Sequence, residues 1–186
     1  MQTNRLASTA LPLTCASLLA VLVSAGCSPN QPPSDQGAKT ASSDTASINA
    51  ELAAWSKAFS AHDVDGIMAL YSPDVRSFDM VPPLQIVGRD AYRKDYEGFL
   101  SLYKGPIEVE FRDVQTAVSG DLAVYMGLER LGGTLANGQK SAGWVRVTSV
   151  FRKVGGKWVD IHDHVSVPAD MTTGKAAFDL EPSASQ

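Results

Sequence analysis

The sequence has little cysteine, little histidine and no excess of basic residues. Two cysteines, Cys15 and Cys27, and three histidines occur among 186 residues. Lysine and arginine total 16 against 20 for aspartate and glutamate, so the formal net charge is −4. A nucleic-acid partner favours a basic face, because its phosphates are anionic, and this composition argues against such a partner. Cys15 lies in an apolar leader, so the rest of the chain has one thiol, which excludes an intramolecular disulfide and a thiolate metal site.

The leader has the layout of a bacterial secretion signal. Arg5 precedes an apolar or small stretch over residues 6–23, and the segment ends in Val-Ser-Ala-Gly before Cys27. This order predicts a signal peptide over residues 1–26. The cleavage region resembles a bacterial lipobox, with Ser24 where leucine is more usual. The resemblance implies lipidation of Cys27, and hence a lipid anchor in a membrane of the bacterial cell envelope, on its periplasmic or extracytoplasmic side. A plain secretory signal and an uncleaved helical anchor are the alternatives.

The segment after Cys27 contains no large apolar side chain. Residues 28–46 are rich in Ser, Pro, Gln and Asp. A segment of this composition cannot bury enough apolar surface to become ordered. We therefore expect a disordered tether over residues 27–46, a folded domain over residues 47–168, and a C-terminal tail over residues 169–186 that frays or lies on the surface.

Three helices are expected in the first half of the domain. Ser47 and Asp63 can cap the first two, the second of which covers residues 64–71, and Gly88 precedes a third over residues 89–103. The first and third repeat large apolar residues at helical spacing, which predicts a core face rather than a cofactor site. These positions are Ile48, Leu52, Trp55 and Phe59 in the first helix and Tyr92, Tyr96, Phe99 and Tyr103 in the third.

The second half of the domain has the two-residue period of strands. A short strand over residues 75–80 precedes the third helix, and four antiparallel strands follow it, the last two joined by a turn at Gly155-Gly156. A change of parity near Arg112 and Asp113 predicts a β-bulge. Three helices on one face of a curling sheet make an α+β, cone-shaped fold with one open end.

The last strand carries an unusual row of polar side chains. Strict alternation places Trp158, Asp160, His162, His164 and Ser166 on one face, and Asp163 on the other. Two histidines on one face could bind a metal ion, but no third histidine is close in sequence, so we expect no metal and no cofactor.

Three stretches of the chain resemble one family: WSKAFSAHDVDGIMALYSPDV, FDMVPPLQIVGRDAYR and VRVTSVFRKVGGKWVDIHDHVSVP. They are similar to the SnoaL-like branch of the nuclear transport factor 2-like superfamily, which includes ketosteroid isomerases, polyketide cyclases and the association domain of calcium/calmodulin-dependent kinase II. The resemblance covers essentially all of residues 47–168 and implies the cystatin-like cone. Members perform many unrelated functions, so it is specific for the fold and weak for the function.

The resemblance transfers only part of the isomerase site. Asp79 lies nine residues before Gly88, where the isomerases carry their general base. The tyrosine donor of the isomerases falls on Trp55, and their protonated carboxylic acid falls on Thr148 or Ser149, neither of which is an acid. We therefore expect a small hydrophobic or carboxylate ligand, or a partner, to bind without turnover. The alternative is an isomerase, cyclase or hydratase that uses Asp79 as general base, with His164 or Trp55.

These residues are expected to surround one cavity. Asp79, Trp55, His162 and His164 should converge on a volume lined by Phe59, Tyr71 and Phe78. Arg146 could meet an anionic ligand or pair across strands with Glu129. The resemblance also implies a homodimer formed across the outer sheet face, with Tyr125, Leu131, Trp144 and Val150 as candidate contacts.

Overall fold

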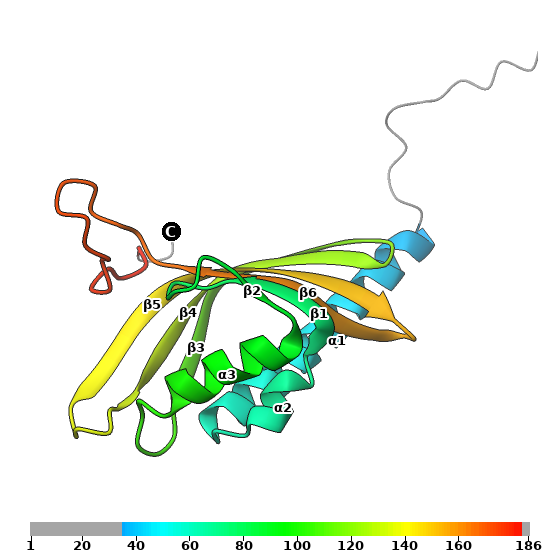
Figure 1. Ribbon diagram of the computed structural model, residues 1–186. Coiled ribbons are helices and arrows are strands. Elements are labelled where there is room, and N and C mark those ends of the chain that lie inside the picture. The colour runs from blue at the N-terminus through cyan, green and yellow to red at the C-terminus, as the bar shows by residue number, and fades with distance from the viewer. Residues whose placement is uncertain (1–34, 184–186) are drawn as a thin grey trace, which may run out of the picture. The chain divides into compact units, whose positions relative to one another are not determined.

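The computed structural model describes residues 35–183 (Figure 1). The expected signal peptide and Cys27 lie outside this range, so both stay predictions. Within it, no helix is long and apolar enough to span a bilayer. The elements are α1 (Asp35–Ser60), α2 (Val64–Met68), β1 (Tyr71–Phe78), β2 (Ile86–Val87), α3 (Arg89–Leu100), β3 (Glu108–Ser119), β4 (Leu122–Thr134), β5 (Lys140–Val154) and β6 (Lys157–Ser166).

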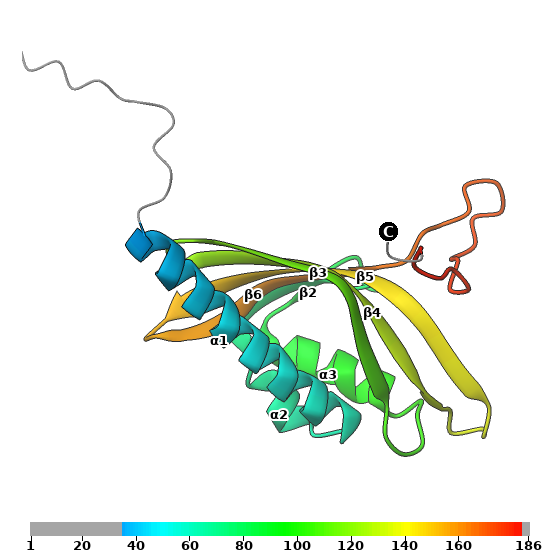
Figure 2. The same ribbon diagram turned by 180° about the vertical axis from the view of Figure 1, so that it is seen from behind.

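The six strands form one sheet in the order β2-β1-β6-β5-β4-β3. The four strands β3 to β6 pair antiparallel with their neighbours, as the sequence predicts, and β1 joins the sheet by a parallel pairing with β6. The three helices lie on the same side of the sheet, which curves around them (Figures 1 and 2). The α+β fold with helices on one face of a curved sheet is confirmed.

Helix α1 begins at Asp35, twelve residues before the expected start at Ser47. The prediction that the tether is disordered up to residue 46 is therefore wrong for residues 35–46. Asp44 accepts hydrogen bonds from Lys153 Nζ at 2.6 Å and from Trp158 Nε1 at 3.3 Å. These polar contacts with the β5–β6 hairpin stabilise this turn of the helix. The turn therefore does not depend on burying apolar side chains of its own.

The second helix ends, and the first strand begins, earlier in the chain than expected. Helix α2 is capped by Asp63, whose Oδ1 accepts from Gly66 N at 3.0 Å, but it ends at Met68 rather than at Tyr71. Tyr71 is the first residue of β1, because its backbone pairs with Asp160 in β6. This difference turns the Tyr71 side chain toward α3, where it meets Tyr92 and Tyr96.

Two bulges interrupt the alternation of the long strands. The expected one in β3 is confirmed: the register with β4 shifts between Arg112 and Gln115, and Asp113 has a φ of 53°. The second was not predicted. In β6, Asp160 pairs with Phe151 and His162 pairs with Val150, which leaves Ile161 as an extra residue without a partner.

The bulge at Ile161 exchanges the two faces of the last strand. Before it, Trp158 and Asp160 are buried; after it, Asp163 is buried and His164 is exposed. The prediction of one polar row from Trp158 to Ser166 is therefore wrong, because an inserted residue reverses the two-residue period.

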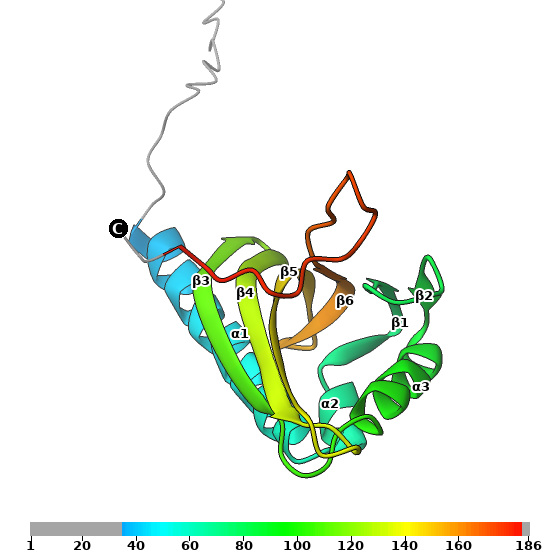
Figure 3. The ribbon, with the colours of Figure 1, turned by 90° about the vertical axis from the view of Figure 1, so that its left-hand side faces the viewer.

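The outer face of the sheet differs from the one expected for a dimer. Tyr125 is buried in the core, and Leu131 lines the internal cavity described below. The C-terminal segment runs across strands β4 and β5 (Figure 3), and on this side Trp144 Nε1 donates to Glu181 Oε2 at 2.8 Å. The tail thus lies on the surface, as expected. Self-association through this face stays a prediction.

Candidate functional site

A cavity of about 340 Å³ lies between the helices and the concave side of the sheet. Its walls are mainly apolar and aromatic, with contributions from α1, α3, β1, β4, β5 and β6. The aromatic lining consists of Trp55, Phe59, Tyr71, Tyr92, Tyr96 and Phe99. The charged or ionisable lining consists of Asp79, Lys94, Asp95, Glu129, Asp160 and Asp163.

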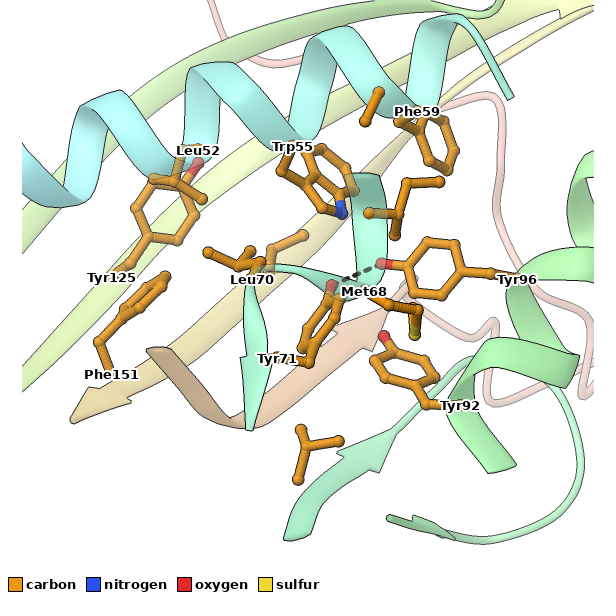
Figure 4. Packing of buried hydrophobic residues seen from close by; sticks show 14 of the residues in the cluster. Leu52, Trp55, Phe59, Met68, Leu70, Tyr71, Tyr92, Tyr96, Tyr125 and Phe151 are labelled. Atoms are coloured by element: carbon orange, nitrogen blue, oxygen red, sulfur yellow. Dashed lines mark hydrogen bonds between the residues drawn. The ribbon is translucent and has the colours of Figure 1, made fainter. Parts of the chain in front are cut away.

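Four hydroxyl groups organise the inner wall around Asp163. Its carboxylate accepts from Tyr92 at 2.8 Å, from Ser149 at 3.0 Å and from Tyr71 at 3.3 Å. Because Tyr71 donates to Asp163, its oxygen accepts the 2.6 Å bond from Tyr96 (Figure 4). Burial raises the pKa of Asp163, and the hydroxyl donors oppose that rise.

Sequence reasoning missed Asp163 because it assumed unbroken alternation along the last strand. A signal was present: Trp158 is an apolar residue of one parity, whereas Val165 and Val167 have the other parity. A change of parity of this kind correctly predicts the bulge in β3. The same reasoning applied to β6 would have placed Asp163 on the inner face.

Four of the predicted site residues line the cavity. Trp55, Phe59, Tyr71 and Asp79 come together there from α1, β1 and the loop after β1. The backbone N–H of Met80 donates to Asp79 Oδ1 at 2.6 Å. Burial, followed by the nearby Asp95 carboxylate, raises the pKa of Asp79 to about 6.

The two histidines and Phe78 do not line the cavity. Phe78 is 38% exposed, and its ring packs edge-on against His162 and His164. His162 Nδ1 is hydrogen-bonded to the backbone oxygen of Arg76 at 2.8 Å. The prediction that His162 and His164 surround the cavity with Asp79 is wrong, because the bulge turns both toward the other side of the sheet.

Arg146 does not reach the cavity or pair with Glu129. Arg146 is exposed and lies opposite Leu128, while the buried Glu129 lies opposite Val145. Adjacent positions on a strand point to opposite faces, so the expected pair of Arg146 with Glu129 is wrong, and contact of Arg146 with an anionic ligand stays a prediction. Glu129 instead accepts a 3.3 Å hydrogen bond from Tyr125 inside the domain, where burial raises its pKa to about 8.

Two buried polar atoms on the cavity lining have no hydrogen-bond partner among the described residues. They are Trp55 Nε1 and Asp160 Oδ1. The indole nitrogen points toward the hydroxyl groups of Tyr71 and Tyr96 (Figure 4), but its approach to Tyr96 lacks the geometry of a hydrogen bond. An unpaired buried polar group costs free energy, which a ligand that pairs with it would recover.

Within residues 35–183, no group of three or more histidine, cysteine, aspartate or glutamate side chains is arranged to hold a metal ion. The side chains of the cavity themselves offer several kinds of interaction. They provide aromatic faces, one free indole N–H and carboxyl groups whose pKa values are raised by burial.

Comparison with known proteins places the chain in a family. The SnoaL-like domain model matches residues 48–170. A nuclear transport factor 2-like protein of unknown function from Pseudomonas putida KT2440 is 34% identical, with a TM-score of 0.69 over 76% of this chain and 98% of that one. A candidate calcium/calmodulin-dependent protein kinase II association domain from Xanthomonas campestris is 26% identical, with a TM-score of 0.58 over 64% and 84%.

More distant structures share the fold alone. A candidate dehydratase of the nuclear transport factor 2-like family from Streptomyces avermitilis is 20% identical, with a TM-score of 0.60 over 67% of this chain and 96% of that one. No functionally curated protein matches the chain. The family match covers the whole cavity-forming domain, so the chain belongs to the SnoaL-like family of the nuclear transport factor 2-like superfamily.

Proposed function

We propose that this domain binds a small, largely apolar molecule in its internal cavity. The observation that carries the proposal is the apolar, aromatic cavity of about 340 Å³ whose wall holds two unpaired buried polar atoms, Trp55 Nε1 and Asp160 Oδ1. Ligand sites in proteins combine apolar walls with a few polar groups that fix orientation. A ligand that fills the space and pairs with either atom would remove the cost of leaving it unpaired.

Charge distinguishes between the two ligand classes expected from the sequence. Five carboxyl groups line the cavity, and the one basic side chain among the lining residues is the exposed Lys94. A carboxylate ligand would be repelled by any of these groups that is ionised, and it finds no buried basic side chain among the lining residues to pair with. We therefore favour a ligand without negative charge.

The test is a titration of the domain with naphthylethanol, naphthylethylamine and naphthylacetate, followed by NMR of the tryptophan indole N–H groups. We expect saturable shifts of the Trp55 signal with at least one probe. The Trp144 signal is the internal control, since its indole is bonded to Glu181 on the outer face and should not move. Equal shifts of both signals, or none with any probe, would contradict the proposal.

A variant pair sharpens this experiment. Leu131→Phe adds volume at the cavity wall and should weaken binding, whereas Leu122→Phe makes the same change at a residue that is 46% exposed and should leave it unchanged. If both variants bind as the parent does, the probes do not occupy this cavity.

General-base catalysis at Asp79 is the second candidate function. A base is most effective when its pKa lies near the working pH, and the pKa of Asp79, raised to about 6, meets this condition. We expect the domain to accelerate exchange of the acidic C–H protons of a bicyclic ketone for deuterium in D₂O. Asp79→Asn should slow this exchange by roughly 10²–10⁴-fold, and Asp90→Asn, at an exposed position on α3, should not. Equal exchange rates in all three proteins would leave binding without turnover as the function.

A further inference from the structure

Three of the carboxyl groups that line the cavity are almost fully buried. Glu129 comes from β4, and Asp160 and Asp163 come from β6; they are 6%, 1% and 4% exposed. None of them takes part in an ion pair among the described residues. Buried carboxyl groups are rarely left without a counter-charge, because removal from water penalises the ionised form.

The three carboxyl groups differ in the number of hydrogen bonds that their oxygens accept. Asp163 accepts from three hydroxyl groups. Glu129 has one long bond of 3.3 Å, to Tyr125. Asp160 Oδ1, on a residue that is 1% exposed, has no hydrogen-bond partner among the described residues, although Ser149 and the His162 backbone act on this carboxyl group and partly oppose the rise of its pKa by burial. The capacity to accept further hydrogen bonds is therefore concentrated on Glu129 and Asp160, whose side chains line the cavity.

The aromatic lining of the cavity suits a positive charge as well. The rings of Trp55, Tyr71, Tyr92 and Tyr96 line the same cavity as the carboxyl groups, and Figure 4 shows how these rings lie. The face of an aromatic ring attracts ammonium groups through its quadrupole, and the attraction grows when water is excluded. Carboxyl groups and aromatic faces thus both favour a cation in this cavity. An alcohol or a ketone could contact the aromatic rings but would have no charge to pair with the carboxyl groups.

We infer that the ligand of this cavity is a hydrophobic organic cation, a small aromatic or alicyclic amine whose ammonium group bonds to Glu129 and Asp160 while its apolar part contacts the aromatic wall. The inference rests on the proposed function, since it names the ligand class of the same cavity. It requires no chemical step.

Binding of a cation has a measurable consequence for protons. The titratable groups around the cluster are Asp79, Lys94, Asp95, Tyr92 and Tyr96, Tyr71 on β1, Tyr125 on β4, and His162 on β6, which favours the ionised form of Asp163. Burial raises the pKa of Glu129 to about 8, so this group is largely protonated near neutral pH. An ammonium beside it favours the ionised form and lowers its pKa. Amine binding should therefore release protons near pH 7, and affinity should rise as the pH rises toward 8.

Calorimetry with the three naphthyl probes tests this inference. We expect naphthylethylamine to bind at least roughly tenfold more tightly than naphthylethanol, and naphthylacetate to bind most weakly. Repeating the amine titration in two buffers of different ionisation enthalpy gives the number of protons released, which should be above zero for the amine and zero for the alcohol.

Variants of the carboxyl cluster provide the matched controls. Glu129→Gln keeps the shape and the acceptor for Tyr125 but cannot ionise, so it should abolish both the preference for the amine over the alcohol and the proton release. Glu108→Gln makes the same change at an exposed position of β3 and should alter neither. If Glu129→Gln does not fold, Asp160→Asn on β6 is the second variant, in which the amine preference and the proton release are measured in the same way.

The outcomes separate this inference from the proposed function. Alcohol binding as tight as amine binding, or an amine preference that survives in both cluster variants, would overturn the inference and leave the cavity as a site for neutral molecules. Failure of every probe to shift Trp55 would overturn the proposed function itself.

Discussion

Acidifying the protein from about pH 8 to about pH 5 is expected to raise its free energy of unfolding, by a few kcal/mol. The cause is that buried carboxyl groups hold protons which the unfolded chain has already lost. Burial raises the pKa of Glu129 from 4.5 to about 8, and that of Asp79 from 3.8 to about 6. Each unit of difference corresponds to about 1.4 kcal/mol per group.

The sign of the effect follows from the proton count. Between the pKa of the unfolded chain and the raised pKa of the folded one, the native state binds more protons, so stability falls as the pH rises. Asp160 and Asp163 act in the same direction, because burial raises their pKa values too. The pKa values of Asp44, Asp74 and Asp170 are lowered, and these groups oppose the trend only at more acidic pH.

Urea unfolding at several pH values, with carbon-13 NMR titration of Asp79, measures this dependence. Glu129→Gln should flatten the profile above about pH 6 and stabilise the protein at about pH 8, since its amide has no proton to lose. Glu108→Gln, at an exposed position, should follow the parent protein. A stability that is flat or rises across this window, together with an ordinary aspartate pKa for Asp79, would show that the cavity carboxyl groups are solvated.

Truncating Phe151 to alanine is expected to cost roughly 3–5 kcal/mol of unfolding free energy. Phe151 lies on β5 and is 0% exposed; in the core it faces Tyr125 and Leu52 (Figure 4). Removing its ring loses the burial of a large apolar group and leaves a cavity that the rigid sheet cannot collapse to fill.

Phe178→Ala is the matched control for this truncation. The same ring is removed, but at a position 51% exposed on the C-terminal segment, where the expected cost is within about 1 kcal/mol. Urea unfolding of both variants gives the two values. A similar small cost for both would mean that the packing around Phe151 is looser than its burial indicates.

Much of the fold could be predicted because local chemistry determines it. Gly88 precedes α3 with a φ of 88°, which a residue with a side chain rarely adopts. Gly155 and Gly156 have φ values of 59° and 85° and turn β5 into β6. The parity change near Asp113 marks the bulge in β3 because a strand must keep its apolar residues on the inner face. Each of these features depends on a few neighbouring residues.

The cavity was predictable only in part. The spacing between Asp79 and Gly88 and the apolar stripe of α1 placed Asp79, Trp55 and Phe59 at one site, since turns and helical spacing are local properties. The position of Tyr71 at the same site was also predicted, although its element was assigned incorrectly, because Tyr71 opens β1 instead of closing α2.

Pairing between distant segments determined what the sequence alone left undecided. The unpaired Ile161 depends on how β6 registers with β5 and β1, and it decides that Asp163, rather than His162 or His164, is on the inner face. The part of α1 that precedes Ser47 includes Asp44, which accepts hydrogen bonds from Lys153 and Trp158, more than a hundred residues away in the chain. A local pattern shows which residues could be buried. The pairing of distant strands decides which side chains face the cavity, and the exclusion of water there decides which carboxyl groups keep their protons.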